Sequence, residues 1–200
     1  MDNKLALTDD SVVKLMTHLI DSKKLPGHVK TIEDAITVAQ MGKELGFGIM
    51  QSFHYIIPIS GKLSLAAKAV GALLRRGGIK YNTIEDGVYI LDDGTAVDTL
   101  LDGQKFKDRR TTIYFYRDGL EERCTFTWKD AAKQGLTTKD NWLRLPKEML
   151  YARCLAKGAN RIGADLLLGL YTTEEMVDVL NINESDIIRT EDGLIQEIKN

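Results

Sequence analysis

The sequence predicts an α+β fold: a small β-sheet with a β-α-β core and a β-hairpin, packed with several helices. Asp118-Gly119 separates two strand-like runs, 112–116 and 120–127, and Asp-Gly in that position is a strong hairpin signal. Residues 63–76 have the apolar spacing of a helix and lie between strand-like runs, which suggests the β-α-β core. Residues 146–162 begin with a proline suited to a first helical turn and continue with an apolar stripe.

Two helices are expected in the first 50 residues. Asp9 or Asp10 can cap the first, because a side-chain oxygen accepts hydrogen bonds from the free N–H groups of the first turn. Thr31 and Asp34 resemble a capping box at the start of the second helix, and the glycines of 46–48 end it.

The next part of the chain is predicted to place strands around the third helix. The aromatic and β-branched composition predicts strands at 53–59, 79–84 and 88–91. Gly61-Lys62 is expected to be a turn that leads directly into the helix at 63–76. Residues 92–103 are acidic and punctuated by glycine, which indicates a solvated loop.

The hairpin is followed by mainly helical sequence. Because side chains alternate along a strand, one hairpin face is polar and rich in hydroxyl groups: Thr112, Tyr114, Tyr116, Arg123, Thr125 and Thr127. A short helix is predicted at 128–133, a loop at 134–140, and the long helix at 146–162. Thr172 with Glu175 matches a capping box for a last helix through Leu180. Beyond it, 187–188 and 194–195 are either short strands or a docked extension.

Charge is distributed unevenly along the 200 residues. The net charge is only −2, but residues 105–161 hold 14 Lys and Arg against 7 Asp and Glu, whereas 162–200 hold 2 against 9. A basic middle followed by an acidic end creates a local field that the total conceals. We therefore divide the chain into a core domain, 1–180, and an acidic C-terminal extension, 181–200. Chance segregation of charge is the alternative explanation.

Several classes of protein receive no support from the sequence. The start lacks an apolar leader and no apolar run is long enough for a bilayer, so a cytoplasmic protein without membrane contact is expected. Cys124 and Cys154 have no metal spacing and are interpreted as free thiols. Gly61-Lys62 lacks the first glycine and the Ser or Thr of a phosphate-binding loop, and the three histidines lack zinc spacing. No cofactor, metal or enzymatic activity is therefore predicted.

The predicted helix at 146–162 carries a row of cations. Arg153, Lys157 and Arg161 recur every fourth residue along the margin of its apolar face. Their spacing of about 6 Å is near that of successive phosphates on a nucleic-acid strand. A solvated face of an ordinary amphipathic helix would show the same pattern, and the pattern alone favours that interpretation.

Two stretches of the chain resemble a known family. Trp142, Pro146-Lys147, Met149-Leu150, Arg153 and Gly169-Leu170-Tyr171 are similar to the signature region of the RecT/Redβ-like phage single-strand annealing proteins. Residues 39–47, 55–58 and Gly61-Lys62 resemble the family's earlier segment. The resemblance implies a protein that binds single-stranded DNA and pairs it with a complementary strand without ATP, in phage recombination inside a bacterial cell. It also implies a homo-oligomeric ring or filament on the strand or annealed duplex, and possible contact with a phage exonuclease or single-strand-binding protein.

The candidate DNA contacts are cationic residues from several segments: Lys62, Arg75, Arg76, Lys105, Lys107, Lys147, Arg153, Lys157 and Arg161. Arg153 and Arg161 match basic positions of the family's DNA-binding helix, and Lys62 falls near a basic position after its early strand. Lys62 is also expected near a helix N-terminus, where backbone N–H groups favour an anion. Arg75 and Arg76 could instead satisfy the C-terminal carbonyls of their helix. Trp142 could stack a base, but a core position is the favoured interpretation.

Three other functions remain open from the sequence. A non-annealing accessory protein of phage replication would bind single strands through the same charges and protect them. A metal-dependent nuclease would use Asp92, Asp93 and Asp98, although no flanking His or Glu completes a ligand set. A structural oligomer would bind its basic middle to a neighbour's acidic end.

Overall fold

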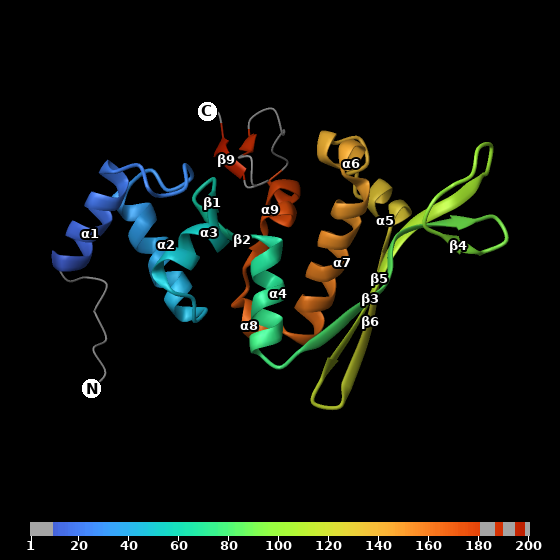
Figure 1. The fold of residues 1–200 in the computed structure, drawn as a ribbon, viewed down its shortest axis with the longest axis horizontal. Helices are drawn as coiled ribbons and strands as arrows, with labels where there is room; N and C mark the ends of the chain where they lie inside the picture. The colour runs from blue at the N-terminus through green and yellow to red at the C-terminus, as the bar shows by residue number, and fades with distance from the viewer. Residues whose placement is uncertain (1–9, 181–186, 190–194, 199–200) are drawn as a thin grey trace. The chain divides into compact units, whose positions relative to one another are not determined.

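The chain has an α+β fold made of two compact units, described by a computed structural model for residues 10–180, 187–189 and 195–198 (Figure 1). Unit 1 takes the chain up to Ala66 together with 185–200, and unit 2 spans Ala67–Glu184. Among the described residues, none of the helices has both the length and the apolar character required to cross a membrane.

Unit 1 is mainly helical. Its elements are α1 (Asp10–Asp21), α2 (Ile32–Glu44), α3 (Ile49–Tyr55), β1 (Ile56–Ile59), β2 (Lys62–Leu65), β8 (Ile187–Arg189) and β9 (Ile195–Ile198). The predicted capping box of α2 is confirmed, because Thr31 Oγ1 accepts from the Asp34 N–H and the Asp34 carboxylate accepts from the Thr31 N–H. The antiparallel pair β8–β9 confirms short strands near the C-terminus, except at Leu194, which lies outside the described residues.

Two secondary-structure predictions in unit 1 are wrong. Residues 53–55, predicted as the first part of a strand, belong instead to helix α3, because Gly48 with Gln51 caps a helix start and Phe53 is fully buried. Lys62 does not open a helix: Ser60 and Gly61 both have positive φ, and their two-residue turn pairs β1 with β2. The helix predicted from residue 63 begins only at Ala67, so Lys62 does not stand directly before the first turn of that helix.

Unit 2 contains the larger sheet and the long helix. Its elements are α4 (Ala67–Arg76), β3 (Lys80–Leu91), β4 (Ala96–Val97), β5 (Phe106–Arg117), β6 (Leu120–Thr127), α5 (Trp128–Lys133), α6 (Asp140–Arg144), α7 (Pro146–Ile162), α8 (Ala164–Leu167), β7 (Tyr171–Thr172) and α9 (Thr173–Val179). The bounds of α5 and α7 agree with the prediction. Helix α6 replaces the end of the predicted loop and the residues after it.

The four-stranded sheet of unit 2 is antiparallel, in the order β4-β3-β5-β6. Asp118 and Gly119 have φ of 49° and 84° and join β5 to β6, which confirms the predicted hairpin. The predicted β-α-β core is not formed, because the strands before and after α4 belong to different sheets. β2 pairs with β1 across a two-residue turn, and antiparallel partners of this kind need no crossover helix.

Helix α7 packs on one face of this sheet, which we call the inner face, and also contacts α4 (Figure 1). Gly158 lies so close to Phe115 of β5 that an added Cβ would stand 2.1 Å from its ring. The thiol of Cys154 donates to the carbonyl oxygen of Cys124 on β6 at 3.2 Å, and both cysteines are free and buried. The apolar stripe predicted for 146–162 is therefore the contact between α7 and the sheet.

Candidate nucleic-acid interface

An open groove runs beside α7, with a volume of about 440 Å³. We call it the basic groove; its lining residues are Phe126, Asp130, Gln134, Arg153, Lys157, Asn160, Arg161 and Glu175. Helix α7 supplies the three cations that the sequence places four residues apart. Asn160 also lies on α7, and the other residues come from the end of β6, from α5 and the turn after it, and from α9.

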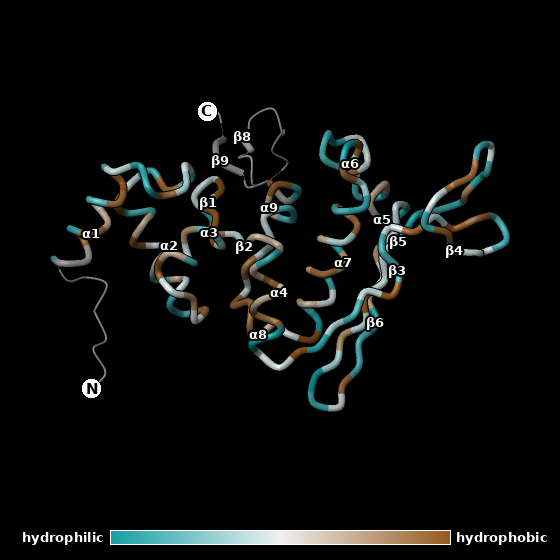
Figure 2. The backbone as a smooth tube through the Cα atoms, viewed as in Figure 1, coloured by the Kyte–Doolittle hydropathy of each residue, from teal (hydrophilic) through white to brown (hydrophobic). Residues whose placement is uncertain are grey.

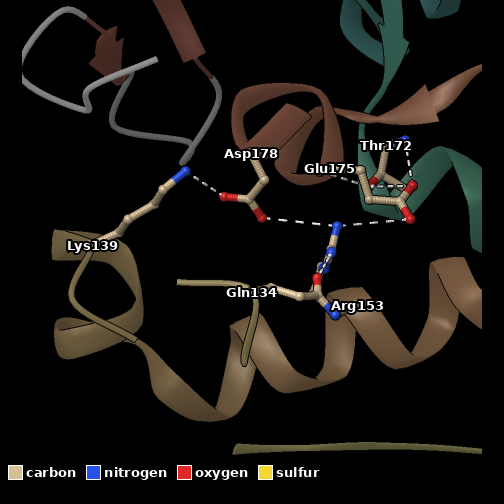
Figure 3. Close-up of polar contacts among 6 residues, drawn as sticks. All are labelled: Gln134, Lys139, Arg153, Thr172, Glu175 and Asp178. Atoms are coloured by element: carbon tan, nitrogen blue, oxygen red, sulfur yellow. Dashed lines mark hydrogen bonds and ion pairs between the residues drawn. The ribbon is translucent and has the colours of Figure 1, made fainter. Parts of the chain in front are cut away.

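Arg153 is largely enclosed, with 14% of its side chain exposed (Figure 3). Its Nη2 donates to Gln134 Oε1 at 2.6 Å, and its Nη1 lies 3.9 Å from Glu175 and 3.8 Å from Asp178. Asp178 also accepts from Lys139 Nζ at 2.8 Å. Arg153 therefore holds α7 to α9 and to the turn after α5, in addition to any ligand it contacts.

Lys157 and Arg161 lie farther along the groove. Lys157 Nζ donates to the carbonyl oxygen of Thr125 at 3.0 Å, which leaves its full positive charge without a carboxylate partner among the ion pairs of the described residues. Arg161 Nη1 pairs with Glu122 at 2.5 Å while 55% of its side chain stays exposed. The hydrogen bond to Glu122 raises the pKa of the Arg161 guanidinium, so this residue is charged at any physiological pH.

The three cations of the groove all make contacts within the protein: Arg153 with Gln134, Lys157 with the Thr125 carbonyl oxygen, and Arg161 with Glu122. The lining of the groove carries three positive and two negative side chains. The Arg161–Glu122 pair is partly exposed, with 55% and 30% of the two side chains accessible, and ion pairs in contact with water contribute little. A phosphate can therefore replace Glu122 at small cost, and Asn160 and Gln134 offer amide N–H donors nearby.

Three other predicted contacts lie outside the groove. Lys147, in the first turn of α7, pairs with Asp86 at 2.9 Å, and that hydrogen bond raises the pKa of its ammonium group. Arg75 and Arg76 are exposed in the last turn of α4, where Arg75 lies over the Tyr81 ring at 5.3 Å. Lys147, Arg75 and Arg76 are therefore not among the residues that line the basic groove with Arg153, Lys157 and Arg161.

The remaining predicted contacts are dispersed as well. Lys105 is exposed just before β5, and Lys107, within β5, donates to the carbonyl oxygen of Asp92 at 3.1 Å. Lys107 therefore lies in a regular strand, one residue after β5 begins. Lys62 is exposed in β2 of unit 1.

Two further predictions can be compared with the structure. Trp142 is fully buried between Phe126 and Trp128, so the favoured core interpretation is confirmed. Asp92, Asp93 and Asp98 are exposed, and Asp93 accepts from the Thr95 N–H at 2.8 Å. Among the described residues, no cluster of His, Cys, Asp or Glu is arranged to hold a metal ion.

The sequence did not indicate the non-basic half of the groove. Asp130 and Glu175 carry out N-terminal capping, and both capping boxes are visible in the sequence. Nothing local shows that these helix starts converge on Arg153, because that proximity depends on how α5, α7 and α9 pack. In comparisons with known proteins, no family model, curated protein or solved structure matches this chain.

Proposed function

We propose that this chain binds single-stranded DNA in the basic groove and anneals complementary strands without ATP, as a compact RecT/Redβ-like annealing core. The observation that supports the proposal most strongly is that Arg153, Lys157 and Arg161 all line one open groove. The resemblance of 142–171 to the signature region of that family supports the same function independently of the groove.

The groove suits the phosphate backbone rather than the bases. Its cations repeat at about 6 Å along α7, so consecutive phosphates can each reach one of them. Phe126, the aromatic residue in the lining, is 4% exposed and packs with Trp142. A strand held by its phosphates keeps its base edges free, and pairing with a second strand requires free edges.

A strand-annealing assay tests this proposal. Two complementary, fluorescently labelled oligonucleotides are mixed with the full chain in the absence of ATP, and duplex formation is compared with a protein-free control. We expect the wild-type chain to speed up pairing relative to the protein-free control. The double variant that carries both Lys157→Ala and Arg161→Ala should lose this acceleration. Each lost phosphate contact is also expected to make the dependence of log K on log salt shallower by roughly 0.7 to 1.

Arg144→Ala with Lys68→Ala is the control matched for charge, because it removes two cations as the groove variant does, and Lys68 is exposed on α4 outside the groove lining. Arg144 is 63% exposed and pairs with Asp140 on α6, so its removal deletes one exposed cation outside the groove. We avoid Arg153→Ala as the main test, because losing its contacts to Glu175 and Asp178 would also disturb packing. Equal losses in the groove and control variants would mean that only total charge matters and would refute the groove as the site.

The same assay separates annealing from strand protection. Binding without acceleration, or slower pairing than in the protein-free control, would contradict annealing and identify a non-annealing accessory protein. Absence of binding at low salt would contradict both functions. The ring or filament assembly and the exonuclease or single-strand-binding partners implied by the resemblance stay predictions.

A further inference from the structure

The sheet of unit 2 has a second face that α7 does not cover. On β5, Ile113 and Phe115 are fully buried toward α7, while Tyr114 and Tyr116 point the other way with 38% and 44% exposure. Hydrophobic and hydrophilic residues alternate along the hairpin strands (Figure 2). Because neighbouring residues of a strand face opposite sides, we call the side with the two tyrosines the outer face.

Each tyrosine stands in a row of three residues across the sheet. Tyr116 lies between Lys80 of β3 and Glu121 of β6. Tyr114 lies between Asn82 of β3 and Arg123 of β6, both exposed. The two rings are two residues apart on one strand, a separation of about 6.8 Å.

We propose that this outer face is a stacking platform for two successive bases of a single-stranded nucleic acid. Tyrosine rings on an open antiparallel sheet present flat apolar surfaces to which unpaired bases stack. A separation of about 6.8 Å exceeds the 3.4 Å rise per base of a duplex strand, so two successive bases can reach the two rings only where the strand is unstacked. Lys80 and Arg123 lie beside the rings, where they can contact the flanking phosphates.

The platform and the basic groove hold a strand differently. The groove, beside α7, contacts phosphates, whereas the outer face contacts bases. Each stacked base contributes a factor of roughly 5 to 150 in affinity, so two bases add to the phosphate contacts without replacing them. We assign to the platform the capture of a second strand; this role, although not the stacking itself, rests on the annealing function proposed above.

Equilibrium binding to two ligands tests the platform. The probes are a labelled oligothymidylate and an abasic phosphodiester of the same length, each titrated with the full chain at constant salt. We expect Tyr114→Ala with Tyr116→Ala to weaken oligothymidylate binding at least 10-fold and to leave abasic binding unchanged. Phenylalanine at both positions should retain wild-type binding, because the ring is kept. Lys157→Ala with Arg161→Ala should weaken binding of both probes alike.

The controls distinguish failure of the platform from failure of the proposed function. Tyr171→Ala removes a tyrosine of similar exposure, 48%, from β7, which is not part of this sheet. If the tyrosine variants bind both probes normally while the groove variant does not, the platform is refuted and the groove stands. If the alanine variants instead reduce oligomer size in sedimentation, the face binds another copy of the chain and the platform is refuted. Circular dichroism confirms that each variant is folded.

Discussion

At the scale of single residues, His28 shows how burial turns an ordinary side chain into a pH-dependent one. Its ring is 7% exposed, and Nε2 donates to the carbonyl oxygen of Phe53 at 2.8 Å. Nδ1 is buried without a hydrogen-bond partner in the described part of the chain, as expected for a neutral imidazole. Burial lowers the pKa of His28 below its ordinary value, because the charged ring would lose its hydration.

This arrangement predicts that unit 1 loses stability in mild acid. The unfolded chain binds a proton at His28 near pH 6.5, whereas the folded chain resists protonation until lower pH. The free energy of unfolding should therefore be constant above about pH 7 and decrease as the pH falls below 6.5, by at most about 1.4 kcal/mol per pH unit. Urea unfolding, followed by circular dichroism at pH 7.5 and 5.5, measures this change in the free energy of unfolding.

His28→Gln is the control for this prediction. The glutamine amide can still donate to the Phe53 carbonyl, but it does not titrate. Between pH 7.5 and pH 5.5, the free energy of unfolding of the His28→Gln variant should change less than that of the wild type. Equal losses in both proteins would assign the pH dependence to other groups.

At the scale of elements, the sequence predicted correctly the helices whose ends are set by residues close by in the chain. The ends of α5 and α7 and the capping boxes at Thr31 and Thr172 agree with the structure, because proline and capping residues act within one turn. The strand predicted at 53–59 is confirmed only for β1, Ile56–Ile59, whereas 53–55 and 63–65 were misassigned because helix α3 and strand β2 depend on burial of residues such as Phe53 and Ser64. The groove was predicted only on α7, since its other walls are set by tertiary packing.

The contact of α7 with the sheet makes a prediction about Gly158. Alanine is the better helix former by about 1 kcal/mol, so Gly158→Ala would be stabilising in an isolated helix. Here the new methyl would meet the Phe115 ring at 2.1 Å, and overpacking of this kind typically costs about 1–3 kcal/mol. We expect a net loss of stability in urea unfolding monitored by tryptophan fluorescence.

A double-mutant cycle checks the cause of that loss. In a Phe115→Leu background, the smaller side chain leaves room beside α7, so adding Gly158→Ala should cost less than it does in the wild type. The same cost in both backgrounds would show that the ring is not the obstacle.

At the scale of the whole molecule, the acidic end of the sequence opposes the basic middle. Residues 181–200 contain 2 Lys and Arg against 5 Asp and Glu, and the chain carries a net charge of −2. If DNA binds the basic groove, this charge reduces the attraction at low salt. Changing Glu184, Asp186 and Glu191 to the matching amides brings the net charge to +1, since three negative charges are removed from −2.

We expect this neutralised variant to bind an oligothymidylate more tightly at low salt, by a few-fold. The gain should vanish near 1 M salt, where the screening length is about 3 Å. A control with amides at Asp92, Asp98 and Asp102 has the same net charge, so a larger gain in the first variant would locate the effect in the C-terminal segment. Weaker binding at low salt would contradict the prediction.

The placement of the two tryptophans has a spectroscopic consequence. Trp128 and Trp142 are the only tryptophans of the chain, and both lie in unit 2 with ring centroids 5.9 Å apart. Intrinsic tryptophan emission is therefore a reporter of unit 2, while circular dichroism sums the helices of both units. Recording both signals in one titration distinguishes a single cooperative transition from two, because coincident curves are the mark of a two-state process.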